Sequence, residues 1–126
     1  MCLPMRIHHV AFRTDDVARL ERFYAGVLGL AVTNRQGPRS VWLDLYGAIL
    51  MLEERAPGEV VMQPGTMETV TLAIEPVNHA LYIRRLIEAG VTIEDRTPFT
   101  IYLRDPDGRR VGLSSYPAEL EALSLA

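Results

Sequence analysis

Two segments of this 126-residue chain carry the same pattern: HVAFRTDDVARLERFYAGVLGLAV at residues 9–32 and TVTLAIEPVNHALYIRRLIEAGVTI at residues 69–93. Each begins with an alternating stretch typical of a half-buried strand, continues as an amphipathic helix, and reaches a glycine before a second β-like stretch. Positions 9 and 69 correspond, and the same offset pairs Phe12 with Leu72. The repeat predicts two similar modules built from one supersecondary unit.

Three strand-like stretches follow each helix. They are 30–34, 40–46 and 48–54 in the first module, and 91–95, 99–104 and 110–116 in the second. The last two strands are separated by the turn DPDG, in which proline pre-sets φ and glycine accepts a positive φ. Each module is therefore predicted as βαβββ, in a single α+β domain. The expected parts are a first module at 6–54, a linker at 55–66, a second module at 67–116 and a tail at 117–126.

The helices show one apolar stripe each. In the first module we expect an N-cap at Asp15 or Asp16, a C-terminal glycine at Gly29, and an inward stripe of Val17, Leu20, Phe23, Tyr24 and Val27. In the second we expect a start near Asn78, an end at Gly90, His79 in solvent or in a helix-terminal role, and an inward stripe of Ala80, Ile83, Leu86 and Ile87. The tail is interpreted as a short helix using Leu120 and Leu123, or as a frayed end.

Composition excludes several classes of function. A net charge of −3 and a pI near 5.6 leave no basic surface for nucleic acid. No segment reaches the roughly 18 apolar residues of a membrane span, and no signal peptide is visible. Cys2 is the only cysteine, so an intrachain disulfide and a cysteine-rich metal site are excluded. We expect a cytoplasmic protein.

Strand alternation sorts the side chains between two faces. The inward, apolar set is Val10, Phe12, Val41, Leu43, Leu45, Leu50, Leu52, Val70, Leu72, Ile74, Ile101, Leu103, Val111 and Leu113. The opposite face is mixed, and its candidate ligand-binding residues are His9, Arg13, Trp42, Asp44, Met51, Glu53, Thr69, Thr71, Tyr102, Arg104, Gly112 and Ser114. Such a face is a poor core but a reasonable cleft lining, because exposed aromatic rings are costly; a bare solvated sheet face is the alternative.

The stretches IHHVAFRTDDVARLERFYAGVLGLAV, YGAILMLEE and YLRDPDGRRVGLSSY resemble the vicinal oxygen chelate superfamily, which includes glyoxalase I, extradiol dioxygenases and bleomycin-resistance proteins. The resemblance runs from about residue 6 to residue 116 of this chain. It implies two βαβββ modules whose mixed sheets form a half-open barrel around a cleft, usually in a homodimer.

The resemblance also implies four positions for a divalent metal, and they fall on His9, Met51, Thr69 and Gly112. One imidazole, one thioether, one hydroxyl and a residue without a side chain form a weak donor set for such an ion. We expect no family-type metal and no other cofactor. An altered metal site, in which a β-bulge brings Glu53 toward His9, is the alternative. His8 and His9 are expected on opposite faces and so unable to chelate together.

Three functions follow as hypotheses. The first is a metal-free small-molecule-binding protein that resembles the bleomycin-resistance branch and works as a homodimer. The second is a lyase, isomerase or dioxygenase-like enzyme with an altered or metal-free site, using His9 as base together with Glu53. The third is a non-catalytic interaction or regulatory module. Neither the ligand nor the existence of a reaction can be deduced from these residues.

Overall fold

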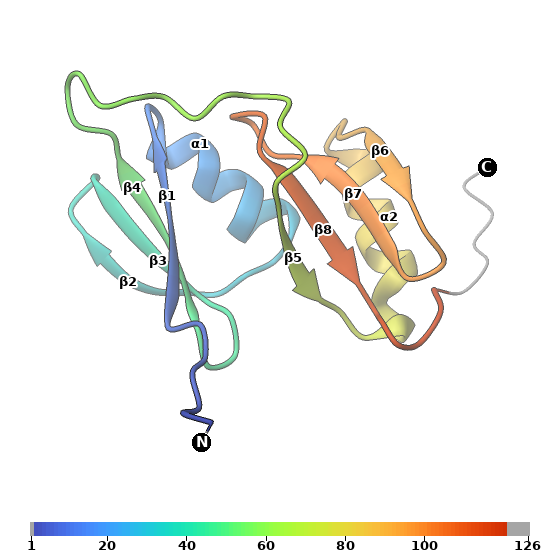
Figure 1. Cartoon of the computed structure of the whole chain (residues 1–126). Helices are drawn as coiled ribbons and strands as arrows, with labels where there is room; N and C mark the ends of the chain where they lie inside the picture. The colour runs from blue at the N-terminus through green and yellow to red at the C-terminus, as the bar shows by residue number, and fades with distance from the viewer. Residues whose placement is uncertain (1, 121–126) are drawn as a thin grey trace. The chain divides into compact units, whose positions relative to one another are not determined.

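The computed structural model describes residues 2–120, and it shows the βαβββ order twice (Figure 1). The first module contains β1 (His9–Thr14), α1 (Val17–Glu21), the π-helical turn η1 (Arg22–Val27), β2 (Val32–Gln36), β3 (Ser40–Asp44) and β4 (Ile49–Glu54). The second contains β5 (Thr69–Ala73), the 3₁₀ turn η2 (Pro76–Asn78), α2 (His79–Glu88), β6 (Ile93–Arg96), β7 (Thr100–Arg104) and β8 (Arg110–Ser114). The predicted strands agree with these within two residues at each end.

Each module has its own four-stranded mixed sheet. The strand order is β1-β4-β3-β2 in the first and β5-β8-β7-β6 in the second. The first and last strands of each module pair in parallel, whereas the other neighbours are antiparallel. Neither sheet closes on itself. The order of the elements and the two mixed sheets confirm the predicted α+β class with tandem βαβββ modules.

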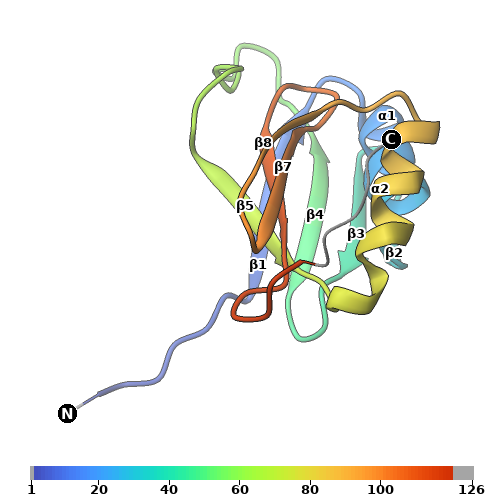
Figure 2. The same cartoon turned by 90° about the vertical axis from the view of Figure 1, so that its right-hand side faces the viewer.

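The inward face of each sheet is buried. Its most deeply buried side chains are Val41, Leu43, Leu50 and Leu52 in the first module, and Ile101, Leu103, Val111 and Leu113 in the second. Burial of each such side chain stabilises the fold by about 1.5–3 kcal/mol. Figure 2 shows the second sheet from its edge, with α2 along one face. The opposite faces are therefore the ones available to ligands.

The first helix begins and ends where the sequence predicts. Asp16 is its N-cap and accepts a hydrogen bond from the Arg19 backbone N–H at 3.0 Å. Gly29 follows the helix with a φ of +83°, which glycine adopts without strain. The buried residues include Phe23 and Tyr24, whose rings meet edge to face with centroids 4.9 Å apart. The π-helical winding of η1 was not predicted.

The second helix follows its predicted stripe in part. Ile83 and Leu86 are buried as predicted, whereas Ala80 and Ile87 are exposed; His79, expected in solvent or in a helix-terminal role, is the first residue of α2 and is 1% exposed. The chain already turns at η2, so α2 starts with its inward stripe at His79, Ile83 and Leu86. These positions keep the i, i+4, i+7 spacing of one helix face, and the prediction was wrong about where that spacing starts.

The predicted linker at 55–66 is attached to both modules. Two compact units divide after Val60, within this segment. The Arg55 N–H donates to the Thr14 carbonyl at 2.9 Å, and the Thr66 carbonyl accepts from Arg104 at 2.7 Å. The segment is therefore not a free spacer. Among residues 2–120, no helix is long and apolar enough to span a membrane.

The tail prediction is only partly covered by the structure. Leu120 is buried, and its N–H donates to the Pro98 carbonyl at 2.7 Å. Leu123, the other apolar residue named for the expected tail helix, lies outside the described residues.

Candidate functional site

The outer face of the first sheet is built from rows of side chains at matching register. One row runs from Ala11 through Met51 to Trp42, and the row beside it from His9 through Ile49 to Asp44. A third row crosses all four strands. It consists of Arg13 on β1, Glu53 on β4, Ser40 on β3 and Gln36 on β2. The register thus places the first-module candidates on one face.

A hollow of about 630 Å³ lies over the third row. All four residues of that row line it, together with Arg39 from the β2–β3 turn, Glu54 at the end of β4 and the segment 55–57 that follows it. Its volume is in the range of small-molecule sites. Of the sequence candidates, Arg13 and Glu53 line this hollow, whereas His9, Trp42, Asp44 and Met51 lie on the same face outside its lining.

The lining is strongly charged and partly fixed by ion pairs. Arg13 donates through Nε and Nη2 to the Glu59 carboxylate, with a shortest distance of 2.8 Å. This hydrogen bonding, with a further bond from the Ala56 N–H, lowers the pKa of Glu59 to about 2. Arg55 donates to Asp15 at 2.8 Å and to the Glu59 carbonyl at 2.6 Å. Arg13 and Arg55 are therefore held by groups outside the lining.

The repeat shows that the fold does not require these charges. The residues of the second module that correspond to Arg13, Ser40 and Glu53 are Ala73, Thr100 and Ser114, which form the matching row of sheet two. There the Thr100 hydroxyl donates to Ser114 Oγ at 2.7 Å, and no residue of the row is charged. One copy of the module folds with a small neutral row, so the charged row of the other copy is a candidate for function.

Trp42 can report on ligand binding at the third row of the first sheet, because it contacts a residue of that row. Its indole Nε1 donates to Ser40 Oγ at 3.1 Å, and Ser40 lines the hollow. It is also the only tryptophan of the chain. A ligand that contacts Ser40 should therefore alter the fluorescence of Trp42.

The structure does not bring His9 and Glu53 together. The pairing of β1 with β4 is regular, with His9 opposite Ile49 and Arg13 opposite Glu53, so the bulge considered from the sequence does not occur. Four residues along parallel strands separate the two side chains by about 13 Å. Glu53 instead lies 3.6 Å from Arg13 Nη1. A direct acid/base pair between His9 and Glu53 has no geometric basis.

The expectation for His8 and His9 was also wrong. His8 precedes β1, so strand alternation does not apply to it, and the two Nδ1 atoms lie 3.0 Å apart. Both rings are exposed. Within residues 2–120, however, no group of three or more His, Cys, Asp or Glu side chains is placed to hold a metal ion.

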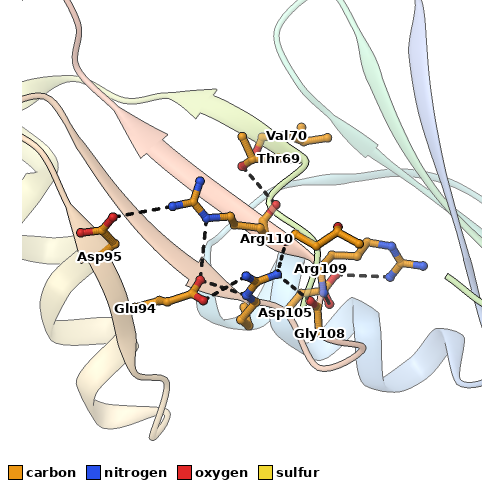
Figure 3. A network of polar contacts seen from close by, with 10 residues as sticks. Thr69, Val70, Glu94, Asp95, Asp105, Gly108, Arg109 and Arg110 are labelled. Carbon is orange, nitrogen blue, oxygen red and sulfur yellow. Dashed lines mark hydrogen bonds and ion pairs between the residues drawn. The ribbon is translucent and has the colours of Figure 1, made fainter. Parts of the chain in front are cut away.

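The outer face of the second sheet is occupied by an ion network (Figure 3). Arg104 donates twice to the Glu94 carboxylate at 2.9 Å. The Arg110 guanidinium lies 3.9 Å from the centre of the Tyr102 ring and 3.8 Å from Glu94 and from Asp95. Tyr102 and Arg104 take part in the network. The other candidates named from the sequence on this face are Thr69, Thr71, Gly112 and Ser114.

The four positions that the family resemblance assigns to a metal do not fit one. A β-carbon at residue 112 would stand 2.6 Å from Thr71 Oγ1, so a side chain there would require Thr71 to move. The Thr69 hydroxyl donates to the Arg110 carbonyl at 3.2 Å. His9 and Met51 alone supply one nitrogen and one soft sulfur, which do not satisfy a hard divalent ion.

Sequence reasoning missed Glu59, Arg55 and Arg39. All three belong to segments interpreted as a linker or turn. The Pro57-Gly58 pair could have indicated the position of Glu59, because such a pair favours a turn that brings the chain back toward the sheet. The turn is present, and the Glu59 N–H donates to the Ala56 carbonyl at 3.1 Å.

Two open mixed sheets in tandem βαβββ modules, one of them with a hollow on its outer face, define the architecture of this chain. The model of the Glyoxalase/Bleomycin resistance protein/Dioxygenase superfamily matches residues 6–113. The chain belongs to this superfamily.

Several relatives share the fold. Virulence protein STM3117 of Salmonella typhimurium is 29% identical, covering 88% of this chain and 84% of that protein. Lactoylglutathione lyase from Agrobacterium tumefaciens has a TM-score of 0.68 at 20% identity, with 88% and 93% of the two chains covered. The fosfomycin resistance protein FosX of Listeria monocytogenes, solved with Mn(II) and a dihydroxypropylphosphonic acid, has a TM-score of 0.73 at 17% identity, with 95% and 94% covered. The two structures, at this identity, establish the fold alone.

Proposed function

We propose that this protein binds a small polar molecule without a metal ion. The ligand is held in the hollow over the third row of the first sheet, the row that contains Arg13 and Glu53. The observation that supports this most directly is the contrast between the copies of the module. The first carries Arg13, Glu53 and Ser40 over a hollow, where the second carries a neutral row. Charges that the fold does not need are retained where a ligand can reach them.

The other two hypotheses are less well supported. A catalytic pair of His9 and Glu53 is separated along the strands, and no reaction follows from the groups in the hollow. An interaction module would not need a hollow with charged lining. Assembly as a homodimer, carried over from the family resemblance, remains part of the proposal, and sedimentation at micromolar concentration tests it. The cytoplasmic location likewise stays a prediction.

The test is a ligand screen in the presence of EDTA, read by Trp42 fluorescence and by thermal unfolding. We expect at least one small polar compound to change both signals in the unmodified protein, and Arg13→Gln to weaken that response. Arg35→Gln is the matched control. It breaks an ion pair of the same module, to Glu21 at 2.6 Å, without touching the hollow. Responses that require added metal, or that Arg13→Gln leaves unchanged, would contradict the proposal.

A further inference from the structure

Arg13 and Arg55 are held in the hollow by several hydrogen bonds, whereas the side chains of Glu53, Arg39 and Glu54 have one described contact each, and that of Glu54 is to Arg39. Glu53, whose side chain is 25% exposed, has a single described contact, at 3.6 Å from Arg13 Nη1. That distance is too long for a hydrogen bond. Arg39, whose side chain is 81% exposed, has a single described contact too, from Nε to Glu54 at 3.1 Å. These groups carry opposite charges and keep most of their hydrogen-bonding capacity.

The chemistry of Glu53 and of Arg39 indicates which ligand group each would bind. A half-buried carboxylate is acceptor-only, so Glu53 gains most from an ammonium group, whose hydrogen bonds are charge-assisted. A guanidinium has five N–H donors in a planar fork that matches a carboxylate, and Arg39 engages only Nε. A ligand that satisfies both must carry a cationic and an anionic group, and an ammonium with a carboxylate is the simplest such pair.

The rest of the lining disfavours ligands with one charge. A simple anion would leave the Glu53 carboxylate unpaired beside another negative charge. A simple cation would enter a hollow lined by Arg13, Arg39 and Arg55. The lining also contains no aromatic ring, so it offers no surface on which a ring of the ligand could stack.

We propose that the hollow binds a small zwitterion of the amino-acid type, with its ammonium on Glu53 and its carboxylate on Arg39. This inference rests on the proposed function and specifies its ligand class. The distance between the two charges of the ligand is set by the span from Glu53 to Arg39, so a series of different chain lengths should show one optimum.

The probes are glycine, β-alanine and γ-aminobutyric acid as zwitterions, with propionate and propylamine as singly charged controls, all at constant ionic strength. Binding is followed by Trp42 fluorescence. We expect one zwitterion to bind at least about tenfold more tightly than either control, since each charge-assisted contact contributes that order of affinity. Propionate or propylamine binding as tightly as every zwitterion would overturn the inference.

Three variants assign the two ends of the ligand. Glu53→Gln should reduce the zwitterion to the affinity of propionate, and Arg39→Gln should reduce it to that of propylamine. Arg35→Gln is the matched control, because it removes a guanidinium of the same module that is paired with Glu21 and does not line the hollow. It should leave the affinity unchanged. Equal losses in Arg39→Gln and Arg35→Gln would mean that Arg39 acts through overall charge or stability, and would overturn the assignment.

The two proposals fail in different ways. If a neutral or anionic compound binds in an Arg13-dependent manner while no zwitterion does, the hollow is a ligand site and the zwitterion inference is wrong. If no compound of any charge type changes fluorescence or thermal stability, both are wrong.

Discussion

The Thr71 hydroxyl oxygen lies 2.6 Å from the point where a β-carbon on residue 112 would stand. The two residues face each other across the β5–β8 pair, in which Thr71 is directly opposite Gly112. The threonine methyl is also close, at 3.0 Å. Glycine at 112 is therefore required by its neighbour, and the loss of a side chain at this position is coupled to the presence of threonine at 71.

The first prediction concerns this coupling. Gly112→Ala should destabilise the protein by about 1–3 kcal/mol, because the new methyl group overlaps Thr71. In a Thr71→Ala background the nearest remaining atom is Cβ at 3.2 Å, so the cost should largely disappear. Urea unfolding of the four proteins of this double-mutant cycle gives the coupling free energy.

Thr71→Val is the control for that cycle, since valine keeps the bulk of threonine and removes only its hydroxyl. Gly112→Ala should cost as much in the Thr71→Val background as in the unmodified protein. Additive costs in the Thr71→Ala background would mean that the crowding is relieved elsewhere.

The fold and the sorting of faces could be predicted because both depend on local periodicity. The internal repeat predicted the order of the helices and strands, and strand alternation predicted which side chains lie on the outer faces of the sheets. The turn at 105–108 also follows its sequence, with Gly108 at a φ of +88° and its N–H bonded to the Asp105 carbonyl at 2.9 Å.

The hollow could not be predicted, because it depends on register between strands and on a chain segment returning to the sheet. Glu59 is 46 residues from Arg13 along the chain, and no periodic pattern connects them. The burial of His79 was missed as well, because its inward position depends on where α2 begins after the 3₁₀ turn, whereas Ile83 and Leu86 were placed correctly.

The second prediction is a pH dependence. In the folded protein the pKa of Glu59 is about 2, lowered from 4.5 mainly by Arg13. A depressed pKa means that the stabilisation is present above about pH 4.5 and is lost as the pH falls toward 2. Carboxyl-carbon NMR should show a Glu59 midpoint near 2, and Arg13→Gln should move that midpoint upward while the Ala56 N–H keeps part of the shift.

Glu59→Gln supplies the corresponding stability test. Its free energy of unfolding should depend less steeply on pH between 4.5 and 2 than that of the unmodified protein, because one linked proton is removed. Parallel curves in this window would mean that Glu59 titrates alike in the folded and unfolded chain.

The third prediction compares two glycines with open space around the β-carbon. Gly90 has a φ of +74°, whereas Gly26 lies inside the π-helical η1 and is not among the glycines with a positive φ. Gly90→Ala should destabilise by about 1 kcal/mol, and Gly90→Asn by less. Gly26→Ala should stabilise by roughly 0.5–1 kcal/mol. Thermal unfolding of the variants is sufficient, and the same sign for both alanine substitutions would contradict the assigned backbone of one of them.

The fourth prediction concerns the ion network of the second sheet. Glu94→Gln removes the negative charge that faces both Arg104 and Arg110, and it weakens two charge-assisted hydrogen bonds. Because Glu94 is partly exposed, we expect a loss of roughly 1–3 kcal/mol in urea unfolding. Asp95→Asn is the control. Its only described ion pair is at 3.8 Å from Arg110 and its side chain is 63% exposed, so its cost should stay below about 0.5 kcal/mol. Similar costs for both variants would mean that the network acts through overall charge, whereas the expected difference would assign the stabilisation to the bonds between Glu94 and Arg104.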